Sequence, residues 1–236
     1  MGSKGFEIEN HVLKRYTGSR VNVDIPDGIT KIGKGAFLGC MMKSVTLPNS
    51  VKEIASHAFE GCLFLENIEI PSSVTKIGSH AFEGCHSLLS VTIPSGVTKI
   101  SNFTFKNCYS LIHIKIPNSV TSIDNHAFSN CGIIRIIQMP SSVTSIGIHA
   151  FSGCQSLIGI YIPKGVTSIG RGAFKGCMTF TGVMIPDGVT SIGKRAFFGC
   201  YYLKKIYCEA ASQLKGWHEN WLEGCTAEIV WGYKEE

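Results

Sequence analysis

Short runs in which polar and apolar residues alternate recur along this chain, and they predict β-strands with one buried face. In the run LENIEI at residues 65–70, the last four residues alternate polar and apolar. Each regular run leads into a proline, which cannot donate a ladder hydrogen bond and therefore ends the strand. The following V-T-x-I motif predicts a second short extended piece. The A-F-x-G-C motif is too short for a full helix and predicts a single helical or 3₁₀ turn.

These elements repeat with one period along most of the chain. The eight prolines are Pro26, Pro48, Pro71, Pro94, Pro117, Pro140, Pro163 and Pro186, so the first spacing is 22 residues and every later one is 23. Phenylalanines and cysteines recur in step with them. A period this regular predicts stacked coils, each made of one supersecondary unit, with no internal linker.

The residue before each repeating cysteine is expected to have a left-handed backbone, because only glycine and asparagine occur there. This set comprises Gly39, Gly61, Gly84, Asn107, Asn130, Gly153, Gly176 and Gly199. The position after V-T-x-I differs, because Gly is replaced there by Ala55, Ser101 and Asp124. That position is expected to require a small or polar residue and not a positive φ.

The repeated motifs resemble the BspA-like class of leucine-rich repeats, which takes its name from a bacterial surface antigen. They are IPSSVTKIGSHAFEGC at residues 70–85, IPSGVTKISNFTFKNC at residues 93–108 and six related copies, and together they cover residues 25–208. The resemblance implies a leucine-rich-repeat solenoid, a right-handed curved coil with short parallel β-strands on its concave face. It also implies a bacterial protein that acts in adhesion or protein recognition, without catalysis.

The chain is expected to form one domain with three parts. Residues 1–24 are predicted to form an N-terminal hairpin cap that turns at residues 17–19, and residues 25–208 a solenoid of about eight 23-residue repeats. Residues 209–236 are predicted to form a Trp-rich C-terminal cap, since a stack exposes apolar faces at both ends.

The C-terminal cap contains all three tryptophans of the chain. A short helix is predicted over residues 209–215, ended by Gly216, and a last strand over residues 227–231. The tryptophans are interpreted as a lid, and an aromatic ligand site is the alternative.

The repeating cysteines are expected to form a buried column of reduced thiols. Equivalent residues of stacked coils lie about 5 Å apart, and cysteine suits such a column as a small apolar side chain with a weak S–H donor. The column runs through Cys40, Cys62, Cys85, Cys108, Cys131, Cys154, Cys177 and Cys200. Cys208 and Cys225 fit core positions of the same frame, so no cysteine remains for a catalytic role.

Four histidines share the position before the Ala of A-F, and they are interpreted as surface residues of the outer turn. They are His57, His80, His126 and His149, while Gly35, Phe103, Gly172 and Arg195 occupy this position in the other coils. Two adjacent histidines could lie close enough to share a metal, but no carboxylate recurs in the same position and two ligands make a poor site. A zinc site built from Cys200, Cys208, His218 and Cys225 has irregular spacing and is disfavoured. No metal, cofactor or catalytic residue is therefore predicted.

Composition narrows the choice of partners. A formal charge of +5, spread along the 236 residues, falls short of the basic footprint of a nucleic-acid binder. No apolar run approaches the ~18 residues of a membrane span. The N-terminal stretch has no apolar segment typical of a secretory signal. Localisation is left open, because the resemblance favours the cell surface or secretion while free thiols and the missing signal favour the cytoplasm.

Two outward positions on each strand of the concave face change in character along the chain. Two residues before each proline the chain has Asp24, Thr46, Glu69, Thr92, Lys115, Gln138, Tyr161 and Met184, and Tyr207 follows in register. Four residues before each proline it has Asn22, Ser44, Asn67, Ser90, His113, Ile136, Gly159 and Gly182, and Lys205 follows. The first half is small and polar, whereas the second half is partly apolar and aromatic.

The apolar half of the concave face is the predicted partner-binding site, centred on Tyr161 and Met184. Its candidate residues are His113, Lys115, Ile136, Gln138, Gly159, Tyr161, Gly182, Met184, Lys205 and Tyr207. The expected function is non-enzymatic recognition of a protein or cell-surface glycan by a monomer or weak dimer. A structural spacer of a larger surface protein is the alternative, and a metal-dependent hydrolase using the histidines a remote one. Drift on a repetitive surface, or a patch covered by the cap or by dimerisation, would also explain the apolar residues.

Overall fold

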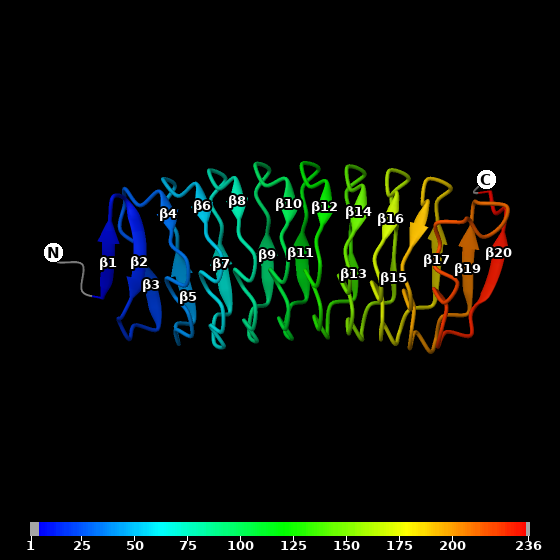
Figure 1. Cartoon of the computed structure of the whole chain (residues 1–236). Coiled ribbons are helices and arrows are strands. Elements are labelled where there is room, and N and C mark those ends of the chain that lie inside the picture. The colour runs from blue at the N-terminus through cyan, green and yellow to red at the C-terminus, as the bar shows by residue number, and fades with distance from the viewer. Residues whose placement is uncertain (1–4, 235–236) are drawn as a thin grey trace.

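A computed structural model describes residues 5–234, which form a row of stacked coils running from the N-terminal to the C-terminal end (Figure 1). The regular coils supply strands to two sets of parallel ladders. Equivalent residues pair between neighbouring coils, as His113 with Ser90 and Ile114 with Val91. Residues at one position of successive coils therefore form columns along the molecule.

The first set of strands forms a surface that we call the strand face, which corresponds to the predicted concave face. Its strands are β3 (Asn22–Asp24), β5 (Ser44–Thr46), β7 (Asn67–Glu69), β9 (Ser90–Thr92), β11 (His113–Lys115), β13 (Ile136–Ile137), β15 (Gly159–Ile160), β17 (Gly182–Ile185) and β19 (Lys205–Cys208). The hydrogen-bonded ladder runs from β3 to β11, and β13 pairs only with β15 among the described residues. A third segment joins β17, β19 and the last strand, β20 (Glu228–Trp231).

The V-T-x-I motifs and their variants form the second ladder, which consists of two-residue strands. These are β4 (Lys31–Ile32), β6 (Glu53–Ile54), β8 (Lys76–Ile77), β10 (Lys99–Ile100), β12 (Ser122–Ile123), β14 (Ser145–Ile146), β16 (Ser168–Ile169) and β18 (Ser191–Ile192). This ladder is interrupted between β8 and β10. There the Ser101 hydroxyl donates to the Ile77 carbonyl at 2.8 Å, whereas in the preceding coil the Gly78 N–H donates to Ile54.

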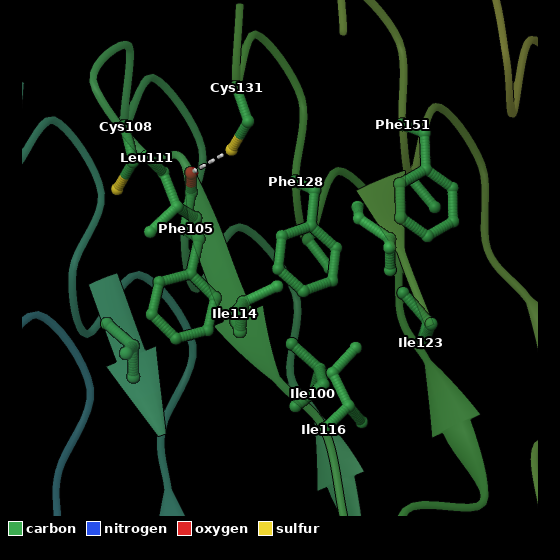
Figure 2. Packing of buried hydrophobic residues seen from close by; sticks show 14 of the residues in the cluster. Ile100, Phe105, Cys108, Leu111, Ile114, Ile116, Ile123, Phe128, Cys131 and Phe151 are labelled. Atoms are coloured by element: carbon green, nitrogen blue, oxygen red, sulfur yellow. Dashed lines mark hydrogen bonds between the residues drawn. The ribbon is translucent and has the colours of Figure 1, made fainter. Parts of the chain in front are cut away.

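The core consists of columns of identical side chains. The eight phenylalanines of the A-F motif and its variants, from Phe37 to Phe197, are fully buried, and their rings stack with centroids 5.0–5.6 Å apart. Figure 2 shows three members of this column and the Cys131 thiol, which donates to the Phe105 carbonyl at 3.2 Å. The same bond recurs in each coil from Cys62 to Cys200, so cysteine fills a small apolar space and also satisfies a buried carbonyl.

The A-F-x-G-C segments form turns instead of the predicted helical or 3₁₀ turn. Glu83 N–H donates to the His80 carbonyl and Cys85 N–H to the Phe82 carbonyl, as in successive turns. The predicted left-handed residue before each cysteine is confirmed, with φ between 61° and 76°. A second left-handed residue, at the histidine position, was not predicted; φ is 61° at both His57 and His80. Two positive φ values in one short segment prevent a helix from forming.

The position after V-T-x-I has an ordinary φ, as expected, and its requirement is for small size. A Cβ on Gly78 would lie 2.5 Å from the Ser56 nitrogen, and one on Gly193 would lie 2.4 Å from the Arg171 nitrogen. Ala55 and Asp124 occupy the same position in other coils. The backbone of those coils must therefore be displaced slightly.

The N-terminal end contains a hairpin, but it is not the one predicted around residues 17–19. Strand β1 (Phe6–Glu9) pairs antiparallel with β2 (Val12–Tyr16), which then pairs in parallel with β4. The turn is at Asn10 and His11, with φ of 48° and 62°, so the prediction of a turn at residues 17–19 was wrong. Two consecutive left-handed residues suit the type I′ turn that short hairpins prefer. Residues 1–4 of the predicted cap lie outside the described part of the chain.

The C-terminal end contains the predicted last strand but not the predicted helix at residues 209–215. Backbone groups of this segment bond laterally, since Glu209 N–H donates to Ile185 and Gly232 N–H donates to Ala210. These bonds compete with those within a helix. Trp217 and Trp221 are buried, and the Trp217 indole donates to the Val189 carbonyl at 2.8 Å. The division into one solenoid with two caps remains a prediction, and its last residues, 235–236, lie outside the described part.

Candidate partner-binding surface

The strands of the strand face place the ten predicted residues on one side, because side chains alternate along a strand. The inward residues between them, such as Ile137 and Ile160, are buried. Ile136 and Tyr161 are the most exposed apolar members, at 63% and 54%. His113, Lys115, Gln138 and Lys205 are also exposed, and Gly159, Gly182, Met184 and Tyr207 are half-buried.

An open depression of about 470 Å³ lies within the predicted site, toward Ile136 and away from Met184, one of the two residues at its predicted centre. It is lined by Ile116, Asn118, Ile136, Ile137, Gln138, Met139, Pro140, Gly159 and Tyr161. Gly159 contributes space, because a Cβ there would meet only the Gly182 carbonyl oxygen, at 3.9 Å. The depression therefore lies beside two exposed apolar side chains of the strand face.

The ladder is also thinnest at this point. Strands β13 and β15 have two residues each, whereas β7, β9 and β11 have three and β17 and β19 have four. Within the described residues, the strand-face ladder does not continue from β11 to β13 or from β15 to β17. The candidate site thus coincides with an irregularity of the backbone as well as of the side chains, which the sequence pattern did not indicate.

The polar half of the strand face has a depression of similar size, about 560 Å³, lined by Asn67, Ile68, Glu69, Ile70, Ser90 and Thr92. Nearer the N-terminal end of the polar half, polar side chains of neighbouring strands bond to each other, since the Ser44 hydroxyl donates to Asn22 at 2.8 Å. The two halves therefore differ in what lines the depressions and not in their size.

The C-terminal members of the predicted set already have partners within the chain. Tyr207 packs against Tyr233 with ring centroids 4.7 Å apart, and Lys205 lies 3.7 Å from the Glu228 carboxylate. Strand β20 and Tyr233, which follows it, therefore engage this end of the set. The residues that remain available around the depression are Ile136, Gln138, Gly159 and Tyr161.

The histidine position forms a second column on another edge of the molecule. His57, His80, Phe103, His126 and His149 stack successively with centroids 4.5–5.0 Å apart. His57 Nδ1 lies 2.5 Å from Glu60 Oε2, and His80 Nδ1 contacts Glu83 Oε2. Lys106 binds the other Glu83 oxygen at 2.9 Å.

The sequence analysis did not predict these contacts, because the glutamates lie three positions after the histidines and no carboxylate recurs at the histidine position itself. The available signal was H-x-x-E in two successive coils, HAFE at residues 57–60 and again at residues 80–83. Among the described residues, His57, Glu60 and His80 gather one ligand atom each within 4.8 Å of one another. Cys200, Cys208, His218 and Cys225 do not gather in this way within the described part of the chain.

The cysteine column offers no reactive thiol in its buried part. Burial raises the pKa of Cys154 to about 12 and raises that of Cys108 well above its ordinary value. A thiol with so high a pKa stays protonated at neutral pH and is a poor nucleophile and metal ligand. The cysteines of the described residues are all free thiols.

Parallel ladders stacked from one short repeating unit define the class of leucine-rich-repeat solenoids. The sequence matches the BspA type leucine-rich repeat region over residues 7–135 and 133–230, and the chain belongs to this family. The resemblance inferred from the motifs, and the predicted parallel solenoid, are thereby confirmed.

Solved bacterial structures support the same assignment. A leucine-rich repeat protein from Bacteroides ovatus is 30% identical over 94% of this chain, with a TM-score of 0.83, and this chain spans 58% of its length. The T. pallidum leucine-rich repeat protein is 31% identical over 86% of this chain and 90% of its own, with a TM-score of 0.60. A Eubacterium ventriosum leucine-rich repeat protein, 23% identical over 93% of this chain and 71% of its own with a TM-score of 0.51, shares the fold. No curated protein matches the sequence.

The described residues contain no helix with the length and apolar character needed to cross a membrane.

Proposed function

We propose that the chain is a non-enzymatic binding module that recognises a protein partner through the strand face, around Ile136 and Tyr161. The observation that carries this proposal is the pair of exposed apolar side chains beside an open depression of the strand face. Folding alone gives no reason for these residues, because the inward columns supply the packing. Contiguous exposed apolar surface rimmed by polar groups is typical of recognition sites.

The rim supports a protein ligand more than a small molecule. The depression is open, Asn118 and Gln138 are in its lining, and His113 and Lys115 are exposed on strand β11. Aromatic anchors with a polar rim are the usual composition of protein interfaces. Met184 and Tyr207 would extend the contact toward β20, where they are half-buried.

The test compares two matched double variants. Proteins captured from cell-surface extracts by the immobilised chain are identified, produced separately and titrated by calorimetry. Ile136→Ala with Tyr161→Ala should weaken binding at least tenfold, because an anchor residue contributes about 2 kcal/mol or more. Thr46→Ala with Thr92→Ala, on the polar half, is the control and should change affinity less than about twofold.

Both variants should unfold at nearly the same temperature as the parent chain. Equal losses in the two double variants would place the site elsewhere. Binding that neither variant changes would favour the spacer interpretation, in which the strand face has no recognition role.

A further inference from the structure

The histidine column contains two histidines in a backbone conformation that residues other than glycine seldom adopt. His57 and His80 both have φ of 61°, whereas glycine occupies the same position at Gly35 and Gly172. A left-handed backbone costs a non-glycine residue roughly 1 kcal/mol. Histidine is among the residues that tolerate this region. Each ring is half-buried and stacks on the next ring of the column.

A carboxylate lies against each of these two rings. Each imidazole contacts a carboxylate of its own coil through Nδ1, Glu60 for His57 and Glu83 for His80. Glu83 is also bound by Lys106, whereas Glu60 has no cationic partner apart from His57 among the described residues. Glu60 is therefore free to act as a ligand, and Glu83 is placed to hold the His80 ring, as carboxylates do for metal-binding histidines.

We propose that His57, Glu60 and His80 bind one divalent transition-metal ion of borderline softness, such as Zn²⁺. Two imidazole nitrogens and one carboxylate oxygen are a usual protein contribution to such ions, with water completing the coordination. Ca²⁺ and Mg²⁺ prefer oxygen ligands alone and are disfavoured by this set.

Binding requires a modest rearrangement. The ligand atoms lie within 4.8 Å of one another, and a tetrahedral ion with bonds of about 2.0–2.1 Å needs them about 3.3 Å apart. The two rings stack with planes 11° apart, so they must turn until both nitrogen lone pairs converge. The three side chains are 28–34% exposed, which leaves room for this rotation.

The same column contains its own control. His126 and His149 also stack with a left-handed backbone, but the residues three positions later are Ser129 and Ser152. Phe103 separates them from His80. This pair therefore has equivalent rings and no carboxylate ligand of its own.

The experiment uses the untagged full chain after chelator treatment, titrated with Zn²⁺ by calorimetry and with Co²⁺ by absorption spectroscopy. The test variants are His57→Gly, His80→Gly and Glu60→Gln, and the control is His126→Gly with His149→Gly. Glycine is chosen because it suits the positive φ, and thermal unfolding verifies that each variant is folded. The parent chain should bind one ion, each test variant should bind at least about tenfold more weakly, and the control should be unchanged.

Several results would overturn the proposal. They are the absence of saturable binding to the parent chain, unchanged affinity in His57→Gly and His80→Gly, or an equal loss in the control. A thiolate-to-cobalt charge-transfer band would assign the ion to cysteine and also contradict the site. A partner that still binds the metal-free chain would leave the strand-face function intact, so the two proposals are tested separately.

Discussion

The inward and outward columns of the same coils follow different rules. The phenylalanine column is fully buried over eight coils, and the cysteine beside it changes exposure only at the N-terminal end. The outward position two residues before each proline changes from Asp24 to Tyr161 and Met184 along the same coils. Stacking thus constrains the identity of inward side chains, which pack against the coils on both sides. The identity of outward side chains is not constrained in this way, so they can serve another role.

The largest expected effect comes from a charge in an inward column. Cys108→Asp should destabilise the chain by about 4–7 kcal/mol or prevent folding, because a buried carboxyl group is displaced by about 3–5 pKa units. Urea unfolding followed by circular dichroism measures this loss. Cys40→Asp, at the half-buried end of the column, should cost much less, and equal losses would show that the column is not a continuous core.

Thiol chemistry offers a second contrast within the same column. Burial raises the pKa of the Cys154 thiol from 9.0 to about 12, so its thiolate is about 10³-fold less populated. Native protein should therefore show few accessible thiols in titration with a disulfide reagent, with Cys40 and Cys225 reacting first. All ten should react in denaturant. Rapid native labelling of six or more would contradict a buried column.

Two phenylalanines in the same region compare inward and outward positions directly. Phe128→Ala removes a fully buried ring that stacks at 5.5 Å on Phe105, and should cost about 3–5 kcal/mol. Phe103→Ala removes a half-buried ring of the histidine column and should cost less than about 1.5 kcal/mol. Thermal unfolding of both variants tests the difference. Similar losses of stability would show that the histidine column also stabilises the fold.

The smallest effect on stability is expected from protonation of the histidine column. Desolvation lowers the pKa of His126, and the positive charges of Lys106 and Arg171 lower it further, while Glu83 acts in the opposite direction. Desolvation also lowers the pKa of His149, and His126, Arg171 and Lys175 add to this effect. The unfolded chain then takes up protons first. The stability contributed by these neutral rings is complete above the ordinary value of 6.5 and is lost as pH falls through it toward the lower folded values.

Urea unfolding between pH 7.5 and 5 measures this dependence. The double variant His126→Gly with His149→Gly should lose less stability over the interval than the parent chain. An unchanged slope in the variant would assign the pH dependence to other groups.

The periodic positions allowed much of the fold to be predicted. Proline, cysteine and glycine or asparagine at constant spacing indicated the coil, the buried thiols and the left-handed residue before each cysteine. Within the period, the helical or 3₁₀ turn predicted at A-F-x-G-C was wrong, and two further predictions failed where the period stops. The turn at Asn10–His11 and the absence of a helix at residues 209–215 depend on contacts with the neighbouring coil, which local patterns do not contain.

The candidate site could be predicted only in part from the sequence. The alternation along a strand placed Ile136 and Tyr161 outward, but it could not show the interrupted ladder or that β20 engages Lys205 and Tyr207. Nor could it show that Glu60 and Glu83 turn back toward the histidines, because a left-handed residue at His57 and His80 redirects the chain.

The sequence by itself determined the repeating unit, its stacking and the identity of each inward column, because these follow from period and from side-chain size. Tertiary structure decided which outward residues remain available to a partner. It also decided which residues at different positions of the repeat contact each other. The physical reason is that parallel stacking aligns equal positions about 5 Å apart in a way that the period alone specifies. Contacts between unequal positions, as between His80 and Glu83 or Tyr207 and Tyr233, depend on turn geometry and on how the chain ends fold back.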